Sequence, residues 1–100
     1  MRQSSQWYDG HVRDQRSREF YNSQEWRAVR DYKLSLNPLC ELCIYSLNGQ
    51  ITRADLVHHL LEISTPEGWE RRLEVRYLQS LCLECHNTVE AERKAQRKRD

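Results

Sequence analysis

The chain has 100 residues, of which 38% are hydrophobic and 31% are charged, and these numbers describe one small domain with a thin core. A domain of this size often needs a metal ion or disulfide bonds to fold stably. The sequence has no stretch apolar enough for a signal peptide or a membrane span, so we expect a cytoplasmic protein whose thiols stay reduced.

The net charge of +1 hides an uneven distribution along the chain. Residues 1–38 carry seven basic and five acidic side chains, residues 39–87 carry four and seven, and residues 88–100 carry five and three. Basic ends around an acidic middle suit a polyanionic partner and a bound cation. Solvated helix faces would give the same distribution, so charge alone leaves both interpretations open.

Residues 1–17 are polar and lack periodicity, which predicts a loose N-terminal arm. A helix is predicted over residues 22–36, with Asn22 and Glu25 as a capping pair and Asn37-Pro38 as its end. Four residues at helical spacing are expected to face the core, with Arg27, Arg30 and Lys33 off that stripe: Trp26, Val29, Tyr32 and Leu36.

The second half of the chain predicts a mixture of strand and helix. Residues 54–63 indicate a mostly buried strand, residues 65–68 a loop, and residues 69–76 a short helix or turn. The segment from about residue 86 to residue 99 lacks Gly and Pro and is rich in good helix formers, which predicts a basic C-terminal helix.

Four cysteines form two Cys-x-x-Cys pairs, Cys40/Cys43 and Cys82/Cys85, separated by 38 residues. Two such pairs can complete a tetrahedral all-sulfur site, which is typical of structural zinc. Two alternatives remain open at this point. Cys82 to His86 also matches the c-type haem attachment motif, and a single pair could be a redox motif.

The histidines suggest a second site. His58 and His59 interrupt an apolar strand, and neighbouring strand residues point to opposite faces, so one ring can face a metal ion while the other faces elsewhere. His86 directly follows the second cysteine pair. The alternative is that these histidines are structural, or that His86 is a spare zinc ligand.

Four segments, in order, resemble the small HNH endonucleases common in bacteriophages, and together they span about 70 residues. They are Arg18-Glu-Phe-Tyr-x-Ser-x-x-Trp-Arg27, Asn37-Pro-Leu-Cys-Glu-Leu-Cys43, Ala54-Asp-Leu-Val-His-His59 and Leu78-Gln-Ser-Leu-Cys-Leu-Glu-Cys-His-Asn87. The resemblance implies a small α+β domain over residues 18–100, with a ββα-metal (HNH) core, a four-cysteine zinc site, a preceding N-terminal helix and a following basic helix.

The resemblance also implies roles for individual residues. His59 matches the general base, and His58 and His86 match two ligands of a catalytic Mg²⁺, Mn²⁺ or Ni²⁺ ion that is distinct from structural Zn²⁺. At the position of the family's middle Asn, thought to hold the loop that orients the base, this chain has Tyr77, which lacks an amide's donor-and-acceptor pair.

The function implied is metal-dependent hydrolysis of DNA phosphodiester bonds, by nicking or double-strand cleavage, in a phage-infected or prophage-carrying bacterial host. Partners by analogy would be phage terminase or portal proteins. Basic side chains are expected to contact phosphates with little sequence specificity: Arg27, Arg30, Lys33, Arg93, Lys94, Arg97 and Lys98. A non-catalytic zinc module that binds nucleic acid or a packaging partner is the alternative, and Tyr77 is the residue that favours it.

Overall fold

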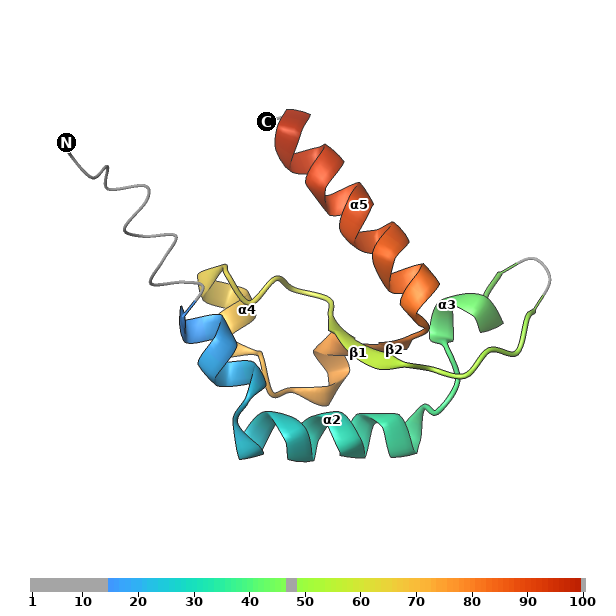
Figure 1. Cartoon of the computed structure of the whole chain (residues 1–100), viewed down its shortest axis with the longest axis horizontal. Coiled ribbons are helices and arrows are strands. Elements are labelled where there is room, and N and C mark those ends of the chain that lie inside the picture. Colours follow the sequence, from blue (N-terminus) through green and yellow to red (C-terminus); the bar gives the residue numbers. More distant parts are fainter. Residues whose placement is uncertain (1–14, 47–48, 100) are drawn as a thin grey trace.

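The computed structural model describes residues 15–46 and 49–99, and it confirms the predicted α+β class (Figure 1). Within these residues, no helix combines the length and the apolar character needed to cross a membrane. Residues 15–21 form a first helical segment, although residues 15–17 were predicted to belong to the arm; the rest of that arm lies outside the described residues. The following elements are α2 (Gln24–Leu36), α3 (Glu41–Ile44), β1 (Leu56–His59), α4 (Pro66–Glu70), the 3₁₀ helix η1 (Val75–Tyr77), β2 (Leu78–Leu81) and α5 (Leu83–Arg99).

The two strands form an antiparallel hairpin in which Leu56 pairs with Leu81 and His59 pairs with Leu78. Strand β1 is shorter than the predicted strand over residues 54–63, because the chain turns away after Leu60 donates its N–H to the carbonyl of Tyr77. Figure 1 shows α2 running beneath the strands, while α5 leaves the end of β2 and projects away from the opposite side.

Helix α2 begins at Gln24, and its N-cap is Ser23 rather than the predicted Asn22. The Ser23 hydroxyl accepts a hydrogen bond from the N–H of Trp26 at 3.2 Å and donates to the carbonyl of Phe20 at 2.7 Å. Asn22 instead belongs to the end of the preceding helical segment, where its N–H donates to the carbonyl of Arg18.

The buried face of α2 also differs from the predicted stripe. Trp26 is buried as expected, but Tyr32 and Leu36 are 57% and 51% exposed, whereas Lys33 is only 6% exposed. The reason is that the four-residue strands are too short to cover the whole helix. The C-terminal half of α2 instead faces α3, where Lys33 Nζ lies 3.1 Å from a carboxylate oxygen of Glu41.

The connection between the strands contains α4, where the sequence predicted a loop over residues 65–68. The Thr65 side chain caps this short helix by accepting a hydrogen bond from Gly68 N–H at 3.0 Å. A Cβ atom at Gly68 would overlap the backbone carbonyl of Glu62, so the tight turn requires glycine at this position.

The structure has two small clusters of buried residues, and the low hydrophobic content had predicted a thin core. One joins the first helical segment, α2 and the hairpin through Phe20, Trp26, Val57, Ile63 and Leu78. The other consists of Leu81 and the cysteines, packed against Leu42, Leu56 and Val89. The second cluster depends on sulfur atoms, which explains how so thin a core holds α3 and α5 to the hairpin.

Helix α5 begins at Leu83, three residues before the predicted start near residue 86. The carboxylate of Asp55, just before β1, accepts a hydrogen bond from Leu83 N–H at 2.8 Å and so caps the helix. As a result Cys85 and His86 both lie in the first turn of α5, and their positions are fixed relative to β1.

Candidate functional site

The four cysteines meet in one cluster, with all four sulfurs within 4.8 Å of one another. The sulfur of Cys43 lies 3.9 Å from that of Cys82 and 3.7 Å from that of Cys85. Zn–S bonds of about 2.3 Å would place the sulfurs of a tetrahedral site about 3.8 Å apart, so the cluster fits a four-coordinate zinc ion. Because all four thiols converge, Cys82 and Cys85 do not form the separate pair that haem attachment or redox chemistry requires.

The segments that carry Cys40 and Cys43 are brought to α5 by a second pairing of the chain. Cys40 N–H donates to the carbonyl of Thr52 at 2.7 Å, and Ala54 N–H donates to the carbonyl of Pro38 at 2.9 Å. Burial, followed by the neighbouring thiols, raises the pKa of Cys85. A bound cation would favour the thiolate form that metal ligation needs.

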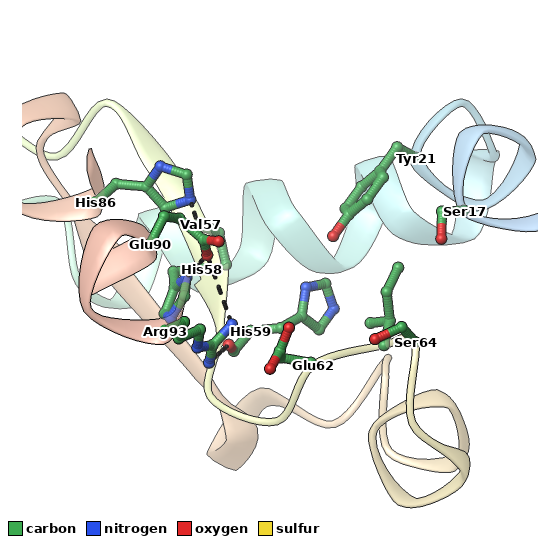
Figure 2. Close-up of a pocket in the computed structure, with 11 residues that line it drawn as sticks. Ser17, Tyr21, Val57, His58, His59, Glu62, Ser64, His86, Glu90 and Arg93 are labelled. Carbon is green, nitrogen blue, oxygen red and sulfur yellow. Dashed lines mark hydrogen bonds and ion pairs between the residues drawn. The ribbon is translucent and has the colours of Figure 1, made fainter. Parts of the chain in front are cut away.

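A second group of potential metal ligands consists of His58 from β1 and His86 and Glu90 from α5 (Figure 2). Their ligand atoms all lie within 4.8 Å of one another. One carboxylate oxygen of Glu90 is 3.7 Å from Nδ1 of His58 and 3.8 Å from Nε2 of His86. Sequence reasoning brought the two histidines together but missed Glu90, whose signal is its position four residues after His86 on one helix face.

His58 is buried, with only 4% of its surface exposed. Burial, and after it the charges of Arg93, His86 and His59, lowers the pKa of His58 to about 4. The ring is therefore neutral at pH 7, which is the form that binds a metal ion.

His59 points away from this group and packs among aromatic side chains. Its ring stacks on Trp26 at a centroid distance of 4.8 Å, and its Nε2 lies 2.9 Å from the backbone oxygen of Arg72. A carbonyl can only accept a hydrogen bond, so Nε2 carries the proton and Nδ1 keeps the lone pair. Burial outweighs that hydrogen bond and lowers the pKa of His59, so the neutral ring has a free lone pair at pH 7.

These groups line one pocket of about 240 Å³. Figure 2 shows His58, His86 and Glu90 at one end, His59 in the middle, and Tyr21 and Ser17 of the first helical segment beyond it. The pocket therefore joins three potential metal ligands to a neutral imidazole, which is a constellation suited to activating water beside a bound cation.

The structure is similar to the crystal structure of the HNH endonuclease of deep-sea thermophilic bacteriophage GVE2 with a manganese ion. The TM-score is 0.81 and the sequence identity 39%, over 93% of this chain and 98% of that chain. This chain belongs to the HNH endonuclease family. The resemblance predicted from four sequence segments is confirmed, and with it the assignment as a phosphodiester hydrolase. None of the protein-family models matches the sequence, and no curated protein is significantly similar to it.

Two of the residues predicted to contact phosphates, Lys33 and Arg93, make contacts within this HNH endonuclease. Lys33 is buried and paired with Glu41, because α2 turns that side chain toward α3. Arg93 uses Nη2 to donate to the carbonyls of His59 and Leu60 at 2.8 and 2.9 Å, since α5 passes over the end of β1. Arg93 thus ties α5 to the strand that carries both adjacent histidines.

The remaining predicted phosphate contacts lie on the surface of the endonuclease or outside the described side chains. Arg27 and Lys94 are exposed, whereas Arg30 is paired with its neighbour Asp31 at 3.1 Å. Arg97 and Lys98 are among the residues whose side chains the structure does not describe.

Tyr77 does not line the pocket of this HNH endonuclease. Its ring lies near the guanidinium groups of Arg71 and Arg76, at 5.2 and 5.1 Å. Both arginines also pair with Glu74 at 3.1 Å, and Tyr77 N–H donates to the Glu74 carbonyl at 3.0 Å. These contacts order the turn that also presents the carbonyl of Arg72 to His59.

Proposed function

We propose that this HNH endonuclease hydrolyses DNA phosphodiester bonds in the pocket, with His59 as the general base and His58, His86 and Glu90 as ligands of a divalent cation. The observation that carries the proposal is the divergence of the two adjacent histidines. His58 faces two further potential ligands, whereas His59 has its own carbonyl partner and is absent from the ligand group. Neighbouring residues of β1 therefore have different roles: His58 is a metal ligand and His59 is the base.

In this proposal Nδ1 of His59 takes a proton from water, and the oxygen of that water attacks phosphorus as the P–O3′ bond breaks. The departing 3′ oxygen takes a proton from solvent, which leaves 5′-phosphate and 3′-hydroxyl ends. Nε2 of His59 keeps its proton and donates it to the carbonyl of Arg72, whose oxygen stabilises the imidazolium as it forms. A divalent ion in the ligand group would supply positive charge against the phosphate and the departing oxygen.

The donor sets favour different ions at the two clusters. Two imidazoles and a carboxylate suit Mn²⁺, Mg²⁺ or Ni²⁺, and the GVE2 enzyme was solved with manganese. Four thiolates suit Zn²⁺. We propose Mn²⁺ as the first ion to test in cleavage, with Zn²⁺ in a structural role.

In this proposal the contacts of Tyr77 order its turn, and so take over the role that the resemblance implies for an Asn at this position. Its ring and the Glu74 carboxylate contact two arginines of the same turn, so the turn is ordered without an amide and Tyr77 is no argument for a purely binding function. A cytoplasmic location and a role in phage DNA packaging with terminase or portal proteins are predictions from the sequence.

The test is nicking of supercoiled plasmid by the zinc-loaded protein with added Mn²⁺. We expect His59→Ala to lower the rate at least about a thousandfold while Mn²⁺ binding is retained, because this residue is a base and not a ligand. His58→Ala should also lose cleavage, with weaker Mn²⁺ binding that excess metal partly restores. If all variants nicked the plasmid at the wild-type rate, the assignment would be rejected. If only His59→Ala lost Mn²⁺ binding, His59 would be the ligand and His58 the base.

A further inference from the structure

Tyr21 is a residue of the pocket that the proposed chemistry does not use. It ends the first helical segment, belongs to the sequence segment 18–27 and is 43% exposed. Within the described part of the chain, its hydroxyl group makes no hydrogen bond. Figure 2 shows the hydroxyl pointing into the pocket, toward His59 and the ligands beyond it.

The position of the Tyr21 ring is fixed by its aromatic neighbours. Its centroid lies 5.7 Å from that of Trp26 with the planes at 79°, and 6.0 Å from that of His59 at 67°. Phe20 lies 5.1 Å away on another side. Aromatic packing of this kind orients a ring. The hydroxyl is therefore directed into the pocket without being held by a polar partner of its own.

The chemistry of the phenol suits an anionic ligand. Burial, and after it the charge of Glu90, raises the pKa of Tyr21, so the group stays a neutral O–H donor at physiological pH. The ligand group occupies the opposite end of the pocket, so a phosphodiester between the two ends would have cation contacts on one side only. A neutral donor on the other side supplies a hydrogen bond to a charged oxygen.

We propose that Tyr21 contacts substrate directly, donating a hydrogen bond from its hydroxyl to a non-bridging oxygen of the phosphodiester in this pocket. The inference rests on the proposed function of the pocket and adds a residue of the first helical segment to it. It also separates the roles within segment 18–27: Phe20 and Trp26 are core, Ser23 caps α2, and Tyr21 faces the substrate.

The matched variant is Tyr21→Phe, which keeps the ring and its packing and removes only the hydroxyl. Its control is Tyr32→Phe, the same change at an exposed position on α2 outside the pocket. We expect Tyr21→Phe to lower kcat/KM for Mn²⁺-dependent cleavage of a defined DNA duplex roughly tenfold or more, as for loss of a hydrogen bond to a charged group. Mn²⁺ affinity and the urea unfolding midpoint should stay at the wild-type values, and the control should cleave normally.

A second measurement uses DNA binding in the cleavage-deficient His59→Ala background. Adding Tyr21→Phe there should weaken binding of the same duplex at least about threefold. If Tyr21→Phe cleaved and bound the duplex like the wild type, the inference would be overturned. It would also be overturned if the variant lost cleavage because it bound Mn²⁺ more weakly. If the wild-type protein failed to cleave DNA, the proposed function would fall, and the binding comparison would decide the role of Tyr21 on its own.

Discussion

The carboxylate of Glu90 lies 3.8 Å from Nε2 of His86, one helical turn earlier on α5, and the same oxygen lies 3.7 Å from Nδ1 of His58 on the neighbouring strand. One acidic side chain thus lies between two imidazoles that come from different elements. A carboxylate in that position would offset part of the positive charge of a bound divalent cation and would be the third protein ligand.

Glu90→Gln should therefore weaken Mn²⁺ binding at least about tenfold, since even residues that only support metal ligands have effects of that size. Glu92→Gln, an exposed change two residues further along α5, is the control and should bind Mn²⁺ like the wild type. Titration calorimetry on the zinc-loaded protein measures both. Equal affinities for the two variants would mean that Glu90 is not a ligand.

The lowered pKa of His58 predicts a pH dependence of stability. The pKa is about 4 in the folded protein and near 6.5 when unfolded, so between these values the unfolded chain binds a proton that the folded chain does not. Stability is therefore lost as pH falls through this window. Between pH 7 and pH 5, without added Mn²⁺, the wild type should lose roughly 2 kcal/mol more unfolding free energy than His58→Gln. Parallel loss in both proteins, measured by urea unfolding, would contradict the assignment to His58.

Zinc removal should unfold much of the domain, because one of the two core clusters is built on the cysteines. Ligation in small metallo-domains contributes roughly 10 kcal/mol or more. We expect Cys82→Ser to abolish the cooperative thermal transition, while Cys85→His, which keeps a ligand atom, should retain part of it. Metal analysis and circular dichroism, with zinc added back after chelation, provide the measurements. A purified protein that is folded and free of zinc would refute this prediction.

The buried ion pair between Lys33 and Glu41 should matter more than the exposed one between Arg30 and Asp31. The Glu41 carboxylate also accepts the N–H of Ser80 at 2.7 Å, so it joins α2, α3 and β2. Removing it leaves a buried ammonium group whose one remaining polar contact among the described residues is Asn37, at 2.8 Å.

Accordingly, Glu41→Ala should cost roughly 3 kcal/mol of unfolding free energy at saturating zinc. The control Asp31→Ala should cost less than about 0.5 kcal/mol. In a double-mutant cycle, adding Lys33→Ala should cost less than it does alone, because the charge it removes is already unpaired. Purely additive effects would show that the two side chains do not stabilise each other.

Sequence could predict the parts of the site that follow from local chemistry. Two Cys-x-x-Cys pairs predict a zinc site and adjacent histidines on an apolar strand suggest a second site, since chelation and strand alternation depend on local spacing. Glu90 lies four residues after His86, so helical spacing places the two side chains on one face of α5. That this face meets His58 depends on the angle at which α5 crosses β1, which the spacing does not give.

The errors in α2 have a related cause. Helical periodicity predicts which residues share a face, but the area that can be buried depends on the partner element. Here each strand of the hairpin is only four residues long. Tyr32 and Leu36 extend past it into solvent, while Lys33 is buried by an acidic side chain contributed from α3. Hydrophobicity alone cannot predict an interior lysine whose partner comes from another element.

The path of α5 also limits how this nuclease can change over evolutionary time. A single helix carries Cys85 of the sulfur cluster and then His86 and Glu90 of the pocket. Inserting one residue between His86 and Glu90 would rotate everything beyond it by about 100° and shift it by about 1.5 Å, so the carboxylate would leave the pocket. The side chains between these three residues can therefore be exchanged, but the spacing of the three is fixed, so we expect insertions and deletions only outside this stretch.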